Sequence, residues 1–90
     1  MNVFVNRYYD RSGAHVGTSF HMFRNHDTTR WGLPVGKSQQ DAGREAAVKG
    51  WTTVVSRLNI RIESGAILKA LNDLAGHPNP ALLLDNEQPQ

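Results

Sequence analysis

Residues 32–38 (GLPVGKS) lie between a predicted strand and a predicted helix, and their glycines and lysine are typical of phosphate binding. A nucleotide-binding loop needs a longer spacing between its glycines, because backbone N–H groups must surround two phosphates. Here three residues separate Gly32 from Gly36, so we interpret the segment as a turn followed by a helix cap at Ser38. N–H groups at the helix start, with Lys37 beside them, remain a candidate site for one phosphate or carboxylate.

The histidines are the next candidates for chemistry, because imidazole is a common metal ligand and proton carrier. His15 and His21 can share one face of a strand, but six residues of strand separate them by about 20 Å. They therefore cannot bind one metal ion. The chain has no cysteine, which excludes thiolate metal sites and disulfides. We predict no metal and no cofactor.

Aromatic and basic side chains are concentrated in the N-terminal half, where we expect them to share one face of a sheet. With both predicted helices packed on one face, the other face would stay open, and an open aromatic face usually meets a partner. The predicted binding residues, for a protein or a nucleic acid, are Arg7, His21, Phe23, Arg24, Arg30, Lys37 and Arg44.

Hydrophobic periodicity predicts the elements that position these residues. Alternation indicates strands over residues 2–9, 14–24, 29–35 and 58–62, and a period of 3.6 indicates helices over residues 39–56 and 64–76. The order β-β-β-α-β-α predicts an α/β fold with a small mixed sheet. We expect a three-stranded antiparallel part, a parallel fourth strand reached by a right-handed crossover, and two helices on one face.

Length and composition bound the function. Ninety residues make one domain, which we place at residues 1–76, followed by a proline-containing, partly flexible tail over residues 77–90. The mean hydropathy is −0.49, and no apolar run approaches the roughly 20 residues of a membrane helix. The absence of cysteine and of a signal-peptide pattern predicts a cytoplasmic protein with no membrane contact.

The charge of the chain is mildly basic and unevenly distributed. The formal net charge is +2, but residues 1–82 hold ten bases against six acids, a charge of +4. This favours an anionic partner. It is far from the dense basic stripe of a dedicated nucleic-acid binder.

Residues 42–51 (AGREAAVKGW) and 58–72 (LNIRIESGAILKALN) resemble the middle of a ribonuclease H-like domain. The resemblance covers about residues 2–75 and implies that family's fold. The family's nuclease chemistry needs clustered carboxylates that hold two metal ions beside a scissile phosphate. In this register the helix glutamate falls on Gly43, the fourth-strand aspartate on Gly65, and the first-strand aspartate on Asn6 or Asp10. The resemblance therefore implies the fold and argues against the activity.

The chain also stops before the last strand and helix of that family, and so resembles the partial ribonuclease H fold of HicB-type antitoxins. We therefore predict a non-catalytic binding protein for a protein partner, such as an antitoxin or a phage or mobile-element inhibitor. Nucleic-acid binding through the basic and aromatic residues is the alternative, and a metal-dependent nuclease is the third. Because so short a chain has a marginal core, we also expect a homodimer.

Overall fold

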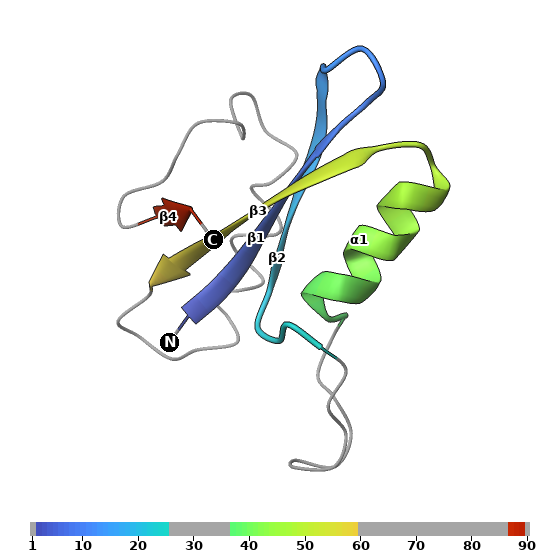
Figure 1. The fold of residues 1–90 in the computed structure, drawn as a ribbon. Coiled ribbons are helices and arrows are strands. Elements are labelled where there is room, and N and C mark those ends of the chain that lie inside the picture. Colours follow the sequence, from blue (N-terminus) through green and yellow to red (C-terminus); the bar gives the residue numbers. More distant parts are fainter. Residues whose placement is uncertain (1, 26–36, 60–86, 90) are drawn as a thin grey trace.

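The computed structural model describes residues 2–25, 37–59 and 87–89, and these residues form one four-stranded sheet and one helix (Figure 1). The strand order in the sheet is β2-β1-β3-β4, and every neighbouring pair is antiparallel. The elements are β1 (Asn2–Tyr9), β2 (His15–His21), α1 (Gln39–Val48), β3 (Thr52–Asn59) and β4 (Glu87–Pro89).

The predicted hairpin between the first two strands is confirmed, and its turn is built by Asp10. The Asp10 carboxylate accepts hydrogen bonds from the backbone N–H of Ser12 at 2.9 Å and of Ala14 at 3.1 Å. Gly13 has φ +87°, which a glycine adopts without the Cβ clash of other residues. The hydrogen bond that the Ser12 hydroxyl donates to this carboxylate has the largest effect in lowering the pKa of Asp10, and the backbone hydrogen bonds lower it further. Local sequence chemistry is therefore sufficient to explain this turn.

The helix begins where the sequence predicts and ends earlier. Ser38 caps α1, its hydroxyl accepting from the Asp41 N–H at 3.2 Å. At the other end Gly50 has φ +83°, and its N–H donates to the Ala47 carbonyl while the Trp51 N–H donates to the Ala46 carbonyl, both at 3.0 Å. This pattern is a Schellman cap, which stops a helix. The predicted helix over residues 39–56 is therefore wrong beyond Lys49.

The predicted mixed sheet is also wrong. β3 pairs antiparallel with β1, from Asn2 opposite Asn59 to Tyr9 opposite Thr52, and the described residues contain no parallel pair and no helix besides α1. The reason lies in the connection. α1 carries the chain from β2 across β1 to β3, so β2 and β3 run in the same direction without touching, and both oppose the central β1. The β-branched run at the start of β3 favours a strand where we expected helix.

Two further predicted elements, the strand over residues 29–35 and the helix over residues 64–76, lie outside the described residues. The same holds for most of the predicted strand over residues 58–62 and for residues 77–86 of the predicted tail. Residues 87–89 of that tail form β4, which pairs with residues 56–58 of β3.

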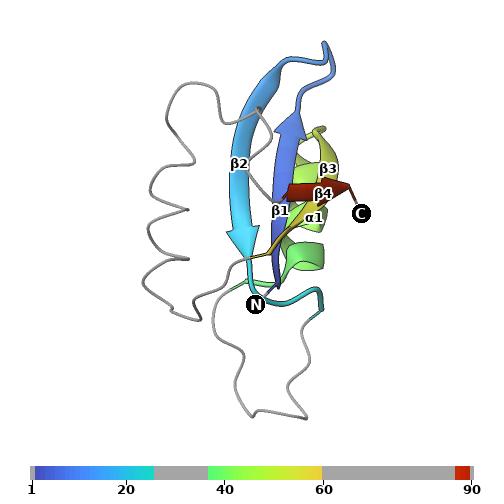
Figure 2. The same ribbon diagram turned by 90° about the vertical axis from the view of Figure 1, so that its left-hand side faces the viewer.

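The sheet has two chemically different faces, because side chains alternate along a strand. Asn6 and Tyr8 of β1 point toward α1, which lies alongside β1 and β3 as a second layer (Figures 1 and 2). The opposite face holds the largest fully buried apolar side chains, Val3 and Val5, with Phe20 and Leu58 beside them. The core of the described residues is therefore weighted toward the face away from α1.

Candidate functional site

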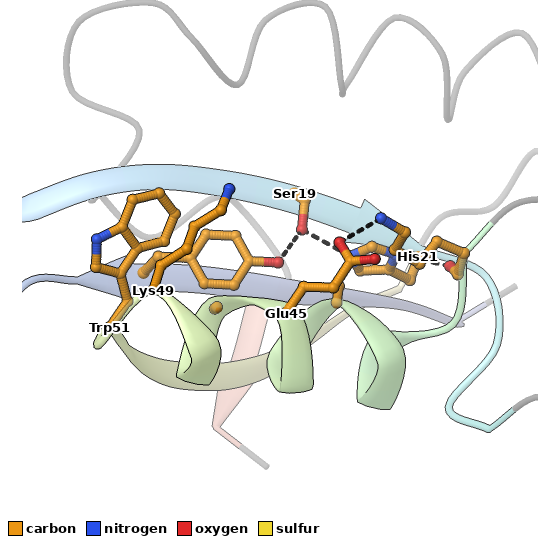
Figure 3. Close-up of a pocket in the computed structure, with 9 residues that line it drawn as sticks. Ser19, His21, Glu45, Lys49 and Trp51 are labelled. Carbon is orange, nitrogen blue, oxygen red and sulfur yellow. Dashed lines mark hydrogen bonds and ion pairs between the residues drawn. The ribbon is translucent and has the colours of Figure 1, made fainter.

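A pocket of about 310 Å³ lies between α1 and the strands β1 and β2 (Figure 3). The sheet supplies its polar groups, the helix supplies small side chains and an acid, and residues on either side of the helix supply two lysines and a tryptophan. The lining residues are Tyr8, Ser19, His21, Lys37, Ala42, Glu45, Ala46, Lys49 and Trp51.

A chain of hydrogen bonds, which we call the relay, connects the polar groups of this pocket (Figure 3). Asn6 Nδ2 donates to Tyr8 Oη at 3.2 Å. Tyr8 Oη lies 2.5 Å from Ser19 Oγ, and Ser19 Oγ lies 2.6 Å from His21 Nε2. His21 Nδ1 lies 2.8 Å from the carbonyl oxygen of Lys37. Cross-strand pairing of β1 with β2 places these side chains on one face.

The groups at the two ends of the relay determine which atom donates in each of its hydrogen bonds. The Lys37 carbonyl only accepts, so His21 Nδ1 carries a proton, and in a neutral imidazole Nε2 then accepts from the Ser19 hydroxyl. Ser19 in turn accepts from Tyr8, whose oxygen accepts from the Asn6 amide. Both hydroxyl protons are used inside the relay. Toward the pocket, the relay therefore presents lone pairs and no O–H donor.

The environment of His21 favours this neutral form. Its side chain is buried beneath α1, and burial lowers the pKa of His21 below its ordinary value. The hydrogen bond to the Lys37 carbonyl raises the pKa, and the charge of Lys37 lowers it further, with burial the largest of the three effects. At neutral pH the imidazole is uncharged, as the direction of the relay requires.

The rim of the pocket carries charges of both signs. Lys37 Nζ lies 2.5 Å from Glu45 Oε2, and these side chains are 47% and 61% exposed. Lys49 Nζ lies 4.8 Å from the centre of the Trp51 ring, a cation–π distance. The Trp51 ring is tilted against Tyr8 with their centres 6.0 Å apart. The pocket thus has an aromatic end, a polar end and a rim of net positive charge.

The start of α1 is not the anion site that the sequence suggested. The N–H groups of Gln39 and Gln40 donate to the carbonyls of Phe23 at 2.8 Å and Arg24 at 3.0 Å. The Asp41 N–H donates to the Ser38 hydroxyl, and the Ala42 N–H donates to the Ser38 carbonyl at 3.1 Å. A helix start binds anions through N–H groups that lack partners, and here the chain satisfies them itself.

The predicted sheet face of aromatic and basic residues is divided between the two sides of the sheet. His21 lies on the α1 side, in the pocket with Lys37. Arg7 lies on the opposite side, where its guanidinium makes a bidentate ion pair with Glu87, and their side chains are 5% and 0% exposed. Consecutive residues of a strand point to opposite faces, so Arg7 and Tyr8 cannot share a surface.

The other predicted binding residues are scattered. Phe23 is half-buried after β2, and the exposed Arg24 places its guanidinium 5.9 Å from the Phe4 ring centre. Arg44 is exposed on α1 and pairs with Asp41 at 3.0 Å. Arg30 lies outside the described residues. Of the predicted binding residues that the structure describes, only His21 and Lys37 lie together in the pocket.

Sequence reasoning missed Ser19, Glu45 and Lys49 as pocket residues. One signal was available for Ser19, because it lies two residues before His21 on a strand and must share its face. The predicted helix over residues 39–56 included Trp51, which instead forms a half-buried wall of the pocket after the helix has ended. Glu45 and Lys49 carry no such local signal.

Comparison with known proteins adds no relative: no family model, no curated protein and no solved structure matches this chain. The resemblance to ribonuclease H-like domains therefore stays a prediction. Within residues 2–25, 37–59 and 87–89, no group of three or more histidines and acids is placed to hold a metal ion. Among the same residues, no helix has the length and apolarity to cross a membrane.

Proposed function

We propose that this chain is a non-catalytic binding protein that holds an extended segment of a protein partner along the outer edge of β3. One observation carries the proposal: β4 covers only residues 56–58 of that edge. Along residues 52–55, no strand among the described residues pairs with β3 on the side away from β1. The backbone groups of an uncovered strand edge accept an added strand, a common mode of peptide recognition.

The side chains on this edge suit a protein partner. Val54 is 53% exposed there, and the residues that flank it on the same face of β3, Thr52 and Ser56, are polar. β4 already shows that a short antiparallel strand docks on the same edge, and a partner strand would continue its line. An antitoxin or a mobile-element inhibitor acts by binding a protein, so we retain this class of role in the proposal.

Charge pairing weighs against the nucleic-acid alternative. Its expected basic contacts were Arg7, Arg24, Arg30, Lys37 and Arg44. Three of them, Arg7, Lys37 and Arg44, form ion pairs with acids of the same chain, and Arg30 lies outside the described residues. The Arg7 pair is buried, so this arginine is not offered to a phosphate, and the three basic residues lie on different parts of the fold, whereas dedicated binders cluster basic groups on one surface. A low-salt gel shift with DNA and RNA tests this point. We expect no shift, and binding that weakens steeply with salt would replace the proposal.

The Ser19–His21 pair requires a separate argument, because a serine bonded to an oriented imidazole is also the arrangement of a nucleophile and its base. Acyl transfer needs donors for the developing oxyanion, often backbone N–H groups. The nearest candidates, at the start of α1, are already bonded within the chain. We expect a fluorophosphonate probe to leave Ser19 unlabelled. Labelling that disappears in His21→Gln would contradict a non-catalytic function.

Substitution of Val54 tests the edge directly. Val54→Lys places a charge on the β3 edge, which disfavours strand addition, while its exposure leaves the fold intact. The matched control is Val48→Lys, because Val48 is 89% exposed and is the last residue of α1, outside β3. A photo-crosslinking residue at Thr52 should capture the same protein from the native host with wild type and Val48→Lys, and not with Val54→Lys. Equal capture by all three would contradict the proposal.

A further inference from the structure

We propose that the pocket between β2 and α1 binds a small carboxylate that carries one aromatic ring, and that binding places a proton on His21. This site shares no residue with the β3 edge, so a result that contradicts one proposal leaves the other unaffected. The argument rests on the two ends of the pocket, on the charge of its rim and on the direction of the relay.

The aromatic end of the pocket indicates the shape and polarity of the main part of the ligand. Trp51 and Tyr8 form a tilted pair, and the small side chains of Ala42 and Ala46 leave space over the helix. Flat apolar groups pack well against such rings. The pocket volume of about 310 Å³ lies at the small end of the range for ligand sites, which suits a single ring with a short polar arm.

The charges on the rim of the pocket indicate the charge of the ligand. Lys37 and Lys49 carry two positive charges against the single negative charge of Glu45. The Lys37–Glu45 pair is largely exposed, and exposed pairs contribute little, so Lys37 can exchange Glu45 for a ligand carboxylate at small cost. Figure 3 shows His21 and Trp51 at opposite ends of the pocket, and Lys37 lies at the His21 end because its carbonyl oxygen is bonded to His21 Nδ1. The carboxylate therefore belongs at the end of the pocket formed by Ser19, His21 and Lys37.

The relay couples this carboxylate to a proton. In the neutral state the Ser19 hydroxyl donates its hydrogen bond to His21 Nε2 and faces the pocket with a lone pair, which repels a carboxylate. When His21 Nε2 is protonated it donates to Ser19 Oγ, and the Ser19 hydroxyl proton becomes available to the ligand. The imidazolium adds a positive charge at the same end. The carboxylate thus binds the protonated form, and its affinity rises as the pH falls.

The charged groups facing His21 come from every neighbouring element. Lys37 precedes α1 and opposes protonation, Glu45 on α1 lines the same pocket and pairs with Lys37, and Arg24 stands across the Phe4 ring, the cross-strand neighbour of His21. A ligand carboxylate that takes Lys37 from Glu45 partly neutralises that lysine. It thereby removes one of the two effects that hold His21 neutral.

Titration with phenylacetate tests the proposal, with amide chemical shifts of the full chain as the readout. Between about pH 8 and pH 5.5 the ligand stays ionised, because ordinary carboxyl groups have a pKa near 4. We expect saturable binding whose affinity rises by up to about tenfold per pH unit on acidification. Phenethylamine, with the same ring and a positive charge, should not bind. Calorimetry in two buffers of different ionisation enthalpy should show uptake of a proton.

Three variants separate the proposal from non-specific binding. His21→Gln should abolish both proton uptake and the pH dependence, and Ser19→Ala should weaken binding at low pH while keeping the fold. Arg57→Gln, an exposed change on β3 outside the pocket, should bind as wild type. The proposal is overturned by any of three results: no saturation at millimolar phenylacetate, an affinity independent of pH, or unchanged binding by folded Ser19→Ala.

Discussion

Asn6, Arg7 and Tyr8 are consecutive residues of β1, yet they belong to two polar networks on opposite faces of the sheet. Toward α1, Asn6 and Tyr8 begin the neutral relay that ends at the Lys37 carbonyl. On the other face, Arg7 joins Glu87 in a charged cluster. The alternation of one strand therefore separates a neutral network from an ionic one by a single residue.

The two networks differ in how fully the hydrogen-bonding capacity of their buried polar atoms is used. In the charged cluster, Arg7 Nη2 donates to Glu87 Oε1 at 2.7 Å, and the Ser56 hydroxyl donates to Glu87 Oε2 at 2.5 Å while accepting from Arg7 Nη1 at 3.2 Å. In the relay, by contrast, Asn6 Oδ1 is buried with no hydrogen-bond partner among the described residues. The relay also opens into a pocket. We infer that the charged cluster fixes the C-terminal strand, whereas the relay serves recognition.

The largest expected effect comes from breaking the charged cluster. Glu87→Ala removes the carboxylate that pairs with the buried Arg7, and removing one partner of a buried ion pair typically costs about 3–5 kcal/mol of unfolding free energy. Urea denaturation measures the loss. The double variant Arg7→Met with Glu87→Leu should recover much of it, because apolar side chains then replace both charges of this pair. If Glu87→Ala unfolds at the wild-type urea concentration, the cluster does not hold β4.

A smaller loss is expected from the relay, because its members are neutral. Tyr8→Phe removes the hydroxyl that donates to Ser19 and accepts from Asn6, leaving both groups short of a partner. We expect a destabilisation of about 1–3 kcal/mol in the same urea measurement. A loss as large as that of Glu87→Ala would contradict the distinction between the two networks.

The relay should also give stability a pH dependence, because it contains His21. His21 has a lowered pKa in the folded state, so on acidification below about pH 6.5 the unfolded chain takes up the proton first. Stability should therefore fall as the pH drops from 6.5 to the lower pKa of folded His21, and level off below it. His21→Gln should reduce this slope in urea titrations across the range, and a slope of opposite sign would contradict the neutral relay.

The smallest effect is expected at the rim of the pocket. The Lys37–Glu45 pair joins a basic to an acidic side chain, as a buried ion pair does. Here, however, both side chains are about half exposed. Lys37→Met should change the unfolding free energy by less than about 1 kcal/mol. The comparison with Glu87→Ala then isolates burial as the cause of the difference. A loss of several kcal/mol would show that Lys37 supports the fold through more than this pair.

Local chemistry was readable from the sequence. Ser38 predicted the start of α1, and Asp10 and Gly13 build the hairpin turn by the same kind of local chemistry, because each acts through backbone groups within a few residues. The end of α1 was also encoded, in Gly50, but the apolar spacing of Trp51, Val54 and Val55 outweighed it in our interpretation. That spacing fits a helix, and only the cap geometry shows that these residues belong to a strand.

The sequence by itself determined the turn, the helix cap and the alternation that places Ser19 beside His21 on β2. The tertiary structure decided that β3 runs antiparallel to β1, that Arg7 meets Glu87 eighty residues away, and that Lys37 brings its carbonyl to His21. The physical reason is how far apart along the chain the interacting groups lie. Caps and turns depend on bonds between near neighbours, whereas strand pairing, ion pairing and the pocket depend on which distant segments the folded chain brings together.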